Sequence, residues 1–325
     1  MEGIKISGIG HYCPENIVNN DDLAKIVDTS DQWIFKRTGI KERRISKGET
    51  TVQLSVNAAI KALKNANCHP NDIDLIIVAT TSPDRLLPST ACIVQKELGC
   101  IKAAAFDIYA ACSGFIYGSI IANSLLKCKE GTKALVVGSE VLSRMVNWED
   151  RNTCVLFGDG AGAAVLEVSN DSSRIISTYF SADGVRGEKA LTASEFSINN
   201  PFFNSSNSLK KYIDMDGKEV FKFAITIIPD IVNKLLEKSN EKIENIKYIE
   251  PHQANIRIID EAAKRLGISK ERFFVNLESY GNTSAASIPI ALSEMVDKGL
   301  IEKGDKIILA AFGGGLTWAG MLIEW

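Results

Sequence analysis

The stretch AACSGF at 110–115 contains the residue best suited to nucleophilic chemistry, Cys112. The pattern around it, from 103 to 127, predicts a strand, a tight turn and then a helix that is apolar on nearly all sides, as in a buried helix. A thiol at the first turn of such a helix lies near unpaired N–H groups and the positive end of the helix dipole, and both favour the nucleophilic thiolate. The small neighbouring residues leave room for a substrate and permit the turn. We therefore predict that Cys112 is a nucleophile.

Two other interpretations of this stretch stay open at the level of the residues. A single buried cysteine is more often an inert, small hydrophobic side chain than a catalyst. A run of about 18 uncharged residues is also long enough to cross a membrane. We nevertheless expect no membrane span, because the first third of the run is typical of strand and turn, and because small or polar residues interrupt the rest: Ser113, Gly114, Gly118, Ser119 and Asn123.

Two further polar residues follow predicted strands. His252 lies in EPHQAN at 250–255, and Asn282 lies in the small-residue turn YGNTSAAS at 280–287. Taken alone, His252 is more often a hydrogen-bonded structural histidine, and Asn282 is a candidate helix cap. Ligands of open α/β sheets bind beyond the carboxyl ends of the strands. Cys112, His252 and Asn282 can therefore converge on one site.

The second half of the chain repeats the pattern of the first. The apolar strand IDLIIVAT at 73–80 corresponds to IKYIEPHQ at 246–253. In the same way, KALVVGSE at 133–140 corresponds to KIILAAF at 306–312. Repeated strand–helix units with near-continuous apolar strands predict an α/β fold in which helices cover both faces of parallel strands.

This repeat also suggests where the chain divides. It places Asn282 near the position that Cys112 occupies in the first half. We expect an N-terminal half at 1–172, which supplies the cysteine, and a C-terminal half at 173–325, which supplies the histidine and the asparagine. Two such halves facing each other would form a single site.

Composition indicates an ordinary globular protein. Of the 325 residues, 45% are hydrophobic and 24% are charged, and the formal net charge of −3 gives no reason to expect a nucleic-acid partner. The seven cysteines show no CxxC spacing and the three histidines lie far apart, so we expect neither a zinc site nor a disulfide framework. The first residues are typical of a strand and show no signal pattern, which predicts a reduced, cytoplasmic protein.

Several other segments have a local interpretation. Apolar residues at helical spacing predict a helix at 51–67, and a shorter helix is expected at 20–27. The sequence GDGAG at 158–162 precedes a strand and lacks the lysine of a phosphate loop, so we interpret it as structural. The Asn- and Ser-rich segment 193–211 is expected to be a surface loop or flap, with three aromatic residues as possible anchors: Phe196, Phe202 and Phe203.

Taken together, these motifs resemble those of the β-ketoacyl-acyl-carrier-protein synthase III family. The resemblance rests on ACSGF around Cys112, PHQAN around His252, GNTSAAS around Asn282 and FGGGLTW at 312–318. It implies a homodimer with a thiolase-like αβαβα fold of five layers, in which the Cys112 helix is the buried middle. Three further motifs agree with the family and extend the resemblance along the chain: DTSDQWIFKRTGIKER at 28–43, LPSTAC at 87–92 and FGDGAGAAVL at 157–166.

The resemblance implies a decarboxylative Claisen condensation that initiates fatty acid biosynthesis. Cys112 would take the acyl group from an acyl-CoA primer, and malonyl-acyl-carrier protein would then lose carbon dioxide and attack the acyl-Cys112 thioester. Neutral His252 and the amide of Asn282 would hold the enolate oxygen, and the N–H groups of Cys112 and Gly314 would form a second oxyanion hole. No metal, flavin or nicotinamide cofactor is expected, because coenzyme A enters as the thioester substrate.

The resemblance also assigns residues to coenzyme A and to the carrier protein. An indole and guanidinium groups suit an adenine ring and phosphates. The CoA-binding residues would be Trp33 and Arg151 around the adenine, Arg37 at the phosphates and Asn255 near the pantetheine arm. An acidic carrier needs local positive charge on a net-negative enzyme, and the expected docking residues are Lys222, Arg257, Lys264 and Arg265.

The acyl pocket and the precise activity are less constrained by the motifs. Three leucines would line the pocket, the first of them reaching across the dimer: Leu87, Leu142 and Leu156. Thiolases need a second cysteine in the C-terminal half, and this chain has none after Cys154. A hydroxymethylglutaryl-CoA synthase needs a glutamate base about thirty residues before the cysteine. In this chain that stretch, residues 79–82, contains no acidic residue. A polyketide-type Cys-His-Asn condensing enzyme and a non-catalytic carrier-binding relative stay open as alternatives.

Overall fold

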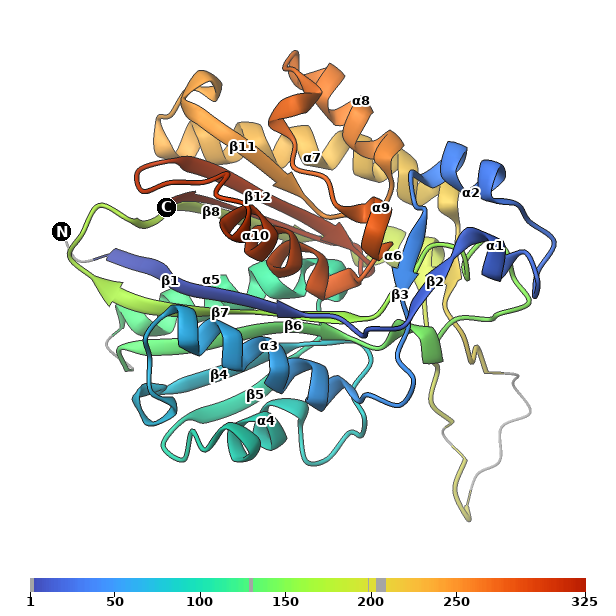
Figure 1. The fold of residues 1–325 in the computed structure, drawn as a ribbon, viewed down its shortest axis with the longest axis horizontal. Helices are drawn as coiled ribbons and strands as arrows, with labels where there is room; N and C mark the ends of the chain where they lie inside the picture. Colours follow the sequence, from blue (N-terminus) through green and yellow to red (C-terminus); the bar gives the residue numbers. More distant parts are fainter. Residues whose placement is uncertain (1–2, 129–130, 198, 203–208) are drawn as a thin grey trace.

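Two β-sheets with helices between and outside them form the body of the protein (Figure 1). The structure is a computed structural model and describes residues 3–128, 131–197, 199–202 and 209–325. In the view of Figure 1, the layers from bottom to top are helices, first sheet, helices, second sheet and helices. This is the αβαβα architecture expected from the sequence.

The first sheet is built from the N-terminal part of the chain. Its strand order is β1-β7-β6-β4-β5; β4 is parallel to β5 and β6, and β7 is antiparallel to both of its neighbours, β6 and β1. β1 therefore runs in the same direction as β6, and the expectation of parallel strands is wrong for one strand of the five, β7. Parallel neighbours need a crossover segment between them, and the chain between β6 and β7 provides no such α-helix. The strands are β1 Gly3–Tyr12, β4 Leu75–Ala79, β5 Ala104–Ile108, β6 Lys133–Glu140 and β7 Gly160–Ser169.

The second sheet repeats this topology with one strand fewer. Its order is β11-β12-β13-β8, with β11 parallel to β12 and the other neighbours antiparallel. The position that corresponds to β5 holds only an isolated parallel bridge between Ile249 and Phe273. The strands are β8 Arg174–Ala182, β11 Ile246–Pro251, β12 Lys306–Gly313 and β13 Thr317–Glu324. The division into halves at 172 and 173 stays a prediction.

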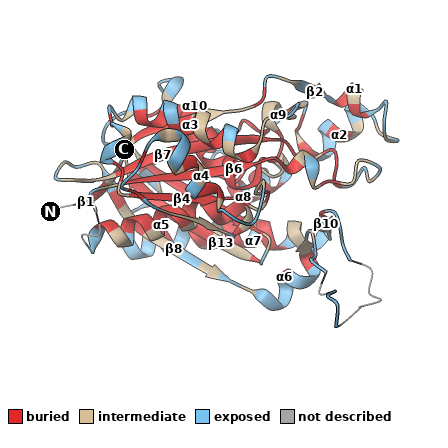
Figure 2. Ribbon diagram, turned by 90° about the horizontal axis from the view of Figure 1, so that it is seen from below, coloured by how far each residue is buried: buried red, intermediate tan, exposed pale blue. Residues whose placement is uncertain are grey.

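Helices cover the sheets in pairs. On the outer face of the first sheet lie α3 Thr51–Asn65 and α4 Thr90–Leu98, and on the outer face of the second lie α7 Gly217–Ser239 and α8 Ile256–Leu266. Between the sheets lie α5 Gly114–Lys127 and α10 Ser287–Asp297. Figure 2 shows that the central strands and this middle layer are mostly buried. The edge strands β5 and β8 are only partly buried.

The middle helix α5 is apolar for a physical reason. Its side chains contact both sheets, so a helix in this layer has no face left for polar groups. Most of its residues are buried, as its sequence predicted, and the helix is 14 residues long. Among the described residues, no helix is both long and apolar enough to cross a membrane.

Corresponding helices of the two halves also end in the same way. α4 stops at Leu98 and α8 stops at Leu266, and the following residues, Gly99 and Gly267, have φ values of 74° and 67°. This left-handed conformation suits glycine and closes the helix. The repeat seen in the sequence therefore extends to the helix caps.

Shorter elements join these layers and differ from the sequence-based expectation in one place. The helix expected at 20–27 ends at Leu23, because Ile26 is exposed and the segment after Leu23 buries little apolar surface. The short elements are β2 Ile17–Asn19, α1 Asn20–Leu23, α2 Asp31–Thr38, β3 Glu42–Arg44, α6 Gly184–Ala190, β9 Leu191–Thr192, β10 Asp214–Met215 and α9 Leu277–Tyr280.

The described residues of segment 193–211, which are 193–197, 199–202 and 209–211, extend from the body of the protein without a helix or strand (Figure 1). The expected anchors are wrong for two of the three residues, because the side chains of Phe196 and Phe202 are 73% and 97% exposed. Phe203 lies outside the described residues. Backbone pairing between β9 and β10 closes the base of the loop, so it needs no buried aromatic side chain.

The fold contains one buried carboxyl group that lacks a partner. Glu250 lies in β11 with no exposed surface, and neither of its side-chain oxygens has a hydrogen-bond partner among the described residues. Burial raises the pKa of this carboxyl well above its ordinary value, so the group is held in its neutral form.

Replacing Glu250 should stabilise the protein. Glu250→Leu should raise the free energy of unfolding by about 1–3 kcal/mol, the usual cost of an unsatisfied buried polar group. The gain should grow as the pH rises above about 4.5, because the unfolded chain then ionises Glu250 while the folded chain does not. Urea unfolding at pH 5 and pH 8 measures both effects. Glu250→Gln should remove the pH dependence but give a smaller increase in the free energy of unfolding, because its amide is still a buried polar group. A loss of stability in Glu250→Leu at both pH values would contradict the conclusion that Glu250 is an unsatisfied buried group.

Candidate active site

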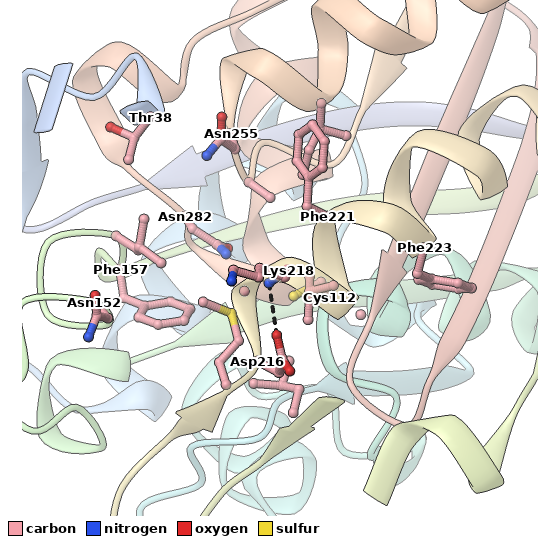
Figure 3. Close-up of a pocket in the computed structure, with 18 of the residues that line it drawn as sticks. Thr38, Cys112, Asn152, Phe157, Asp216, Lys218, Phe221, Phe223, Asn255 and Asn282 are labelled. Carbon is pink, nitrogen blue, oxygen red and sulfur yellow. Dashed lines mark hydrogen bonds between the residues drawn. The ribbon is translucent and has the colours of Figure 1, made fainter. Parts of the chain in front are cut away.

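A single cavity of about 830 Å³ brings the three predicted catalytic residues together. Its lining includes Cys112 from the first half of the chain and His252 and Asn282 from the second. Cys112 and His252 follow the carboxyl ends of β5 and β11, as the sequence predicted. Asn282 does not directly follow a strand, because α9 precedes it, and it pairs through an isolated parallel bridge with Phe157. Figure 3 shows Cys112 and Asn282 facing this space, with Phe157, Phe221 and Asn255 around it.

Cys112 lies in a short 3-10 helix, η2 (Ala111–Ser113), between β5 and α5. Ala111 has φ of 44°, a strained value for alanine, so neighbouring contacts must hold the turn. Ser113 Oγ donates to the carbonyl of Thr317 at 3.0 Å, and Thr317 Oγ1 donates to the carbonyl of Ala110 at 3.1 Å. The second half of the molecule therefore fixes the turn that presents the cysteine.

Burial dominates the ionisation of this cysteine. Its side chain is almost fully buried, and burial raises the pKa of Cys112 to about 12. The nearby Ser284 side chain lowers the pKa of Cys112, and the nearby carboxylate of Glu140 raises it. The sequence-based expectation that the end of α5 favours the thiolate is therefore not met, because desolvation of the sulfur outweighs it. The prediction for Cys112 did not take into account that the surrounding residues exclude water from the turn.

His252 is held as a neutral ring. Its backbone N–H donates to the carbonyl of Ala310 at 2.8 Å, and its Nδ1 lies 2.7 Å from Ser287 Oγ. The ring meets Phe312 edge to face, with 5.3 Å between ring centroids. Burial lowers the pKa of His252 to about 3. Because Nδ1 is occupied by Ser287, Nε2 is the nitrogen left for chemistry in the cavity.

Asn282 is oriented by its own backbone neighbourhood. Its Oδ1 accepts the N–H of Ser284 at 2.9 Å, and its N–H donates to the carbonyl of Leu156 at 2.8 Å. An N–H group can only donate, so the side-chain atom that faces Ser284 is the oxygen. The NH₂ group of Asn282 is therefore free to donate toward the cavity.

A backbone donor lies beside the cysteine as well. Gly313 ends β12 against Cys112, and a Cβ at Gly313 would lie 2.7 Å from the Cys112 nitrogen, so only glycine allows this approach. Gly314 follows in the turn, and within the described part of the chain its N–H has no hydrogen-bond partner. A free N–H at this position can bind a negatively charged oxygen.

The residues expected to bind coenzyme A lie around one end of α2, but the expected sandwich is not open. The guanidinium carbons of Arg37 and Arg151 lie 4.4 Å and 5.1 Å from the ring centroid of Trp33. An adenine between Trp33 and Arg151 would need about 3.5–4 Å on each side, so Arg151 would have to withdraw from its bond to the carbonyl of Asp28. Asn255 lines the cavity and caps α8 by accepting the N–H of Arg257.

The expected docking residues lie on two neighbouring helices, α7 and α8. Lys222 and Arg265 are already paired with Glu219 and Glu261, at 2.6 Å and 3.1 Å. Arg257 and Lys264, in contrast, have no ion pair among the described residues. Arg257 lines the cavity with its guanidinium over the ring of Phe221, and Lys264 is exposed.

The three leucines of the expected acyl pocket are only partly brought together. Leu142 is buried in the same apolar cluster as Leu156, and Leu156 also lines the cavity. Leu87 is 85% exposed and does not line the cavity of its own chain. Within one chain, the structure therefore does not place Leu87 with the other two.

Sequence reasoning missed two residues that act on the predicted ones. Ser287 contacts the ring of His252, and Glu140 acts on Cys112 from the end of β6. Ser287 lies within the recognised motif GNTSAAS, so its position there was a usable signal. Glu140 had no such signal, because a charged residue at the end of an apolar strand is usually solvated.

Comparisons with known proteins show which proteins this chain resembles along its length. The family models described as 3-oxoacyl-[acyl-carrier-protein (ACP)] synthase III and its C-terminal domain match residues 106–184 and 236–325. The β-ketoacyl-[acyl-carrier-protein] synthase III of Clostridium botulinum strain Okra is 54% identical over 327 residues, covering 100% of this chain and 99% of that protein.

Solved structures of the same kind have the same fold. The 3-oxoacyl-[acyl-carrier-protein] synthase III of Aquifex aeolicus is 48% identical, with a TM-score of 0.92 over 99% of this chain and 100% of that one. The corresponding synthase III of Thermus thermophilus is 42% identical, with a TM-score of 0.93 over 99% of each chain. The thiolase-like fold expected from the sequence is confirmed.

The buried ring of His252 leads to a testable pH dependence. The ring should stay neutral from pH 8 down to pH 5, because its pKa of about 3 lies below this range. Since the unfolded chain binds a proton near pH 6.5 and the folded chain does not, His252 should lower stability as the pH falls below 6.5. Nitrogen-15 histidine NMR, with His252→Gln to assign the signal, measures the ring directly. A signal that titrates near pH 6.5 would mean that water reaches the ring.

Proposed function

The chain belongs to the β-ketoacyl-[acyl-carrier-protein] synthase III family, and from this premise we propose how its residues carry out the reaction. It is an acyltransferase that condenses an acyl group with a carrier-bound unit and initiates fatty acid biosynthesis. The observation that carries the assignment of roles is that Cys112, His252 and Asn282 line one cavity although they come from different halves of the chain. The substrates are an acyl-CoA primer and malonyl-acyl-carrier protein.

In the first half-reaction, the sulfur of Cys112 attacks the carbonyl carbon of the acyl-CoA. The new carbon–sulfur bond keeps the acyl group on the enzyme, and coenzyme A leaves as the thiol. The oxygen that becomes negative in this step is held by the N–H groups of Cys112 and Gly314. The unpartnered N–H of Gly314 and the close contact between Gly313 and Cys112 support this arrangement.

In the second half-reaction, malonyl-acyl-carrier protein loses carbon dioxide and becomes an enolate. We assign its oxygen to Nε2–H of His252 and to the NH₂ group of Asn282, which are both donors left free by their neighbours. Ser287 donates to Nδ1 of His252 and so keeps the proton on Nε2. The low pKa of His252 supports a neutral donor, and the carbanion then attacks the acyl-Cys112 thioester.

Substrates enter past Trp33, Arg37, Arg151 and Asn255. We propose that Arg151 turns away from Trp33 to admit the adenine, that Arg37 binds the phosphates and that Asn255 contacts the pantetheine arm. The carrier protein docks on α7 and α8 through its acidic surface. We assign no step to a bound cofactor, because coenzyme A takes part as a substrate.

A homodimer completes this proposal, with the edge strand β5 at the interface. β5 is the last strand of the first sheet, and an uncovered edge strand readily pairs with another chain. Four large apolar side chains near it are exposed, which favours a second copy of the chain as the partner. These are Leu86, Leu87, Ile101 and Tyr109. In such a dimer Leu87 would reach the acyl pocket of the partner subunit, and the enzyme would act in the cytoplasm.

Asn282→Ala should separate the two half-reactions. It should slow decarboxylation and condensation by about 10²–10³, the usual effect of removing one oxyanion donor, and leave acylation of Cys112 nearly unchanged. Mass spectrometry after incubation with acyl-CoA measures the acylation, and carbon dioxide release measures the second step. Cys112→Ala is the control that should take no acyl group. Loss of acylation in a folded Asn282→Ala protein would place Asn282 beside the cysteine as an activator, and an unacylated wild type would exclude catalysis at Cys112.

Arg257→Glu should weaken the carrier substrate selectively. The apparent Michaelis constant for malonyl-acyl-carrier protein should rise several-fold, and the rise should shrink with added salt, because exposed charges act through a screened attraction. The constant for acyl-CoA should barely change. Lys303→Glu is a matched charge reversal at an exposed turn before the amino end of β12, whereas the cavity lies at the carboxyl end of this strand. Equal effects of the two variants, or equal damage to both substrates, would contradict docking at Arg257.

A further inference from the structure

Arg43, in the short strand β3, is fully buried and has no carboxylate partner among the described residues. Its Nη1 donates to the carbonyl of Val18 at 3.1 Å and to Oδ1 of Asn20 at 2.9 Å. Its Nη2 donates to the carbonyl of Val155 at 2.8 Å, and its Nε has no hydrogen-bond partner within the described part of the chain. The guanidinium is therefore held by neutral oxygens.

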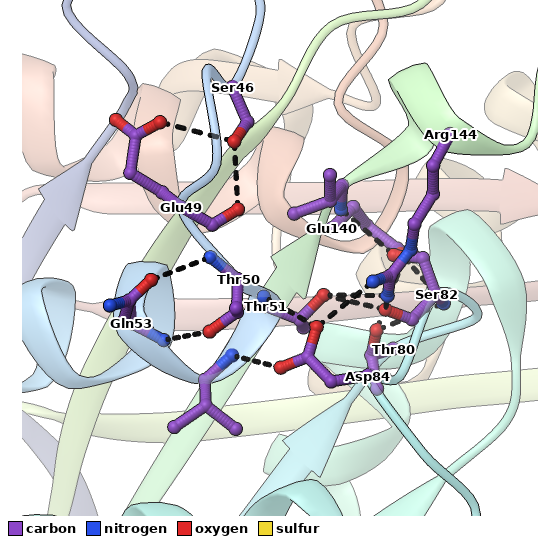
Figure 4. Close-up of polar contacts among 12 residues, drawn as sticks. Ser46, Glu49, Thr50, Thr51, Gln53, Thr80, Ser82, Asp84, Glu140 and Arg144 are labelled. Atoms are coloured by element: carbon purple, nitrogen blue, oxygen red, sulfur yellow. Dashed lines mark hydrogen bonds and ion pairs between the residues drawn. The ribbon is translucent and has the colours of Figure 1, made fainter.

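This arrangement is costly, because a buried charge loses its hydration. At Arg144 the structure shows the commoner arrangement, in which a partly exposed guanidinium pairs with the carboxylate of Asp84 at 3.0 Å (Figure 4). Burial lowers the pKa of Arg43 to about 10, so its guanidinium is still charged at neutral pH. Neutral donors would satisfy the same oxygens at a lower cost, so stability alone does not explain a cation at this position.

The segment that follows Val155 holds Asn282, one of the two proposed enolate donors. Phe157 and Asn282 form an isolated parallel bridge. In this bridge the N–H of Asn282 donates to the carbonyl of Leu156 at 2.8 Å, and the N–H of Gly158 donates to the carbonyl of Asn282 at 3.0 Å. Asn282 lies in no helix or strand, so these two bonds determine where its backbone lies in the cavity.

Arg43 contacts both segments of this bridge. A Cβ at Gly158 would lie 3.2 Å from the Cβ of Arg43, and a Cβ at Gly281 would lie 3.4 Å from it, so glycine at both positions permits the close approach. The guanidinium also holds the chain just before the bridge, through the carbonyl of Val155. Its other amino group is anchored on β2 and α1. Arg43 therefore joins a fixed part of the fold to the bridge that carries Asn282.

Resting on the proposed role of Asn282 as an enolate donor, we infer that Arg43 is a positioning residue whose N–H groups fix segment 155–158 and, through it, the place of the Asn282 amide. Arg43 does not line the cavity, so it acts through Asn282 and touches no substrate. A planar guanidinium suits this task because its N–H groups point in fixed directions and can bond two segments at once. A lysine would keep the charge but lose this fork.

The test compares the two half-reactions in variants of Arg43. Arg43→Met removes the donors and keeps an unbranched side chain. It should leave acylation of Cys112 by acyl-CoA nearly unchanged and slow carbon dioxide release from malonyl-acyl-carrier protein by about 10–10²-fold, because a displaced donor meets the enolate poorly. Arg43→Lys should fall between the wild type and Arg43→Met. Arg43→Met combined with Asn282→Ala should be no slower than Asn282→Ala alone, because a residue that acts through Asn282 then has nothing to act on.

Hydrogen exchange, measured by mass spectrometry, reports the positioning without any activity. Peptides that contain the N–H groups of Gly158 and Asn282 should exchange several-fold faster in Arg43→Met, because the bridge has lost its support. Arg272→Met is the matched control, since Arg272 is a partly buried arginine that donates to two carbonyls at the amino end of β11, away from the cavity. It should change neither the exchange of these peptides nor the ratio of the two half-reactions.

Four results would overturn the inference. These are equal slowing of both half-reactions in a folded Arg43→Met protein, additive effects in the double variant, full activity in Arg43→Lys, and unchanged exchange in the two peptides. If Arg43→Met does not fold, Arg43→Lys is put through the same measurements. A wild type that takes no acyl group, or an Asn282→Ala variant that releases carbon dioxide normally, would contradict the proposed function, and the exchange data would still decide whether Arg43 positions Asn282.

Discussion

Two close approaches of backbone to backbone hold this site together. At Gly138, strand β6 of the first sheet meets the 3-10 helix η6 (Ser284–Ala286) from the second half of the chain, and at Gly313, strand β12 meets the turn of Cys112. A side chain at either glycine would occupy the space of the opposing backbone. These contacts place Asn282 and Ser284 beside the cysteine and hold Ala111 in a conformation that its own sequence disfavours. The catalytic geometry is therefore a property of the contact between the halves.

The same close packing removes water, and this shapes the chemistry of the site. Desolvation favours the neutral thiol of Cys112 and the neutral ring of His252. For the histidine this suits the proposed role, because a neutral imidazole can donate to an enolate without bringing a full charge. For the cysteine it is a cost, and the hydrogen bonds and N–H groups around the sulfur must offset it.

Two buried carboxyl groups show how much the local donors matter. Glu140 and Glu250 are both completely buried in strands of the two sheets. Glu140 is surrounded by hydroxyl and N–H donors, whereas Glu250 has no partner among the described residues. Burial raises the pKa of both, yet only Glu140 has an environment that can hold a charge. One group is thus available to act on the cysteine, and the other only lowers stability.

The sequence by itself determined the strands of the first sheet, two strands of the second, β11 and β12, and the buried middle helix, and it singled out Cys112, His252 and Asn282 as candidates. These follow from apolar periodicity and short motifs, which are local properties of the chain. Tertiary structure alone decided which strands run antiparallel, that Glu140 and Ser284 act on the cysteine, that Arg151 closes over Trp33 and that Leu87 is exposed. It also decided that burial favours the protonated thiol of Cys112, against the expectation from the helix dipole. Burial and hydrogen bonding depend on residues far apart in the sequence, so no local pattern contains them.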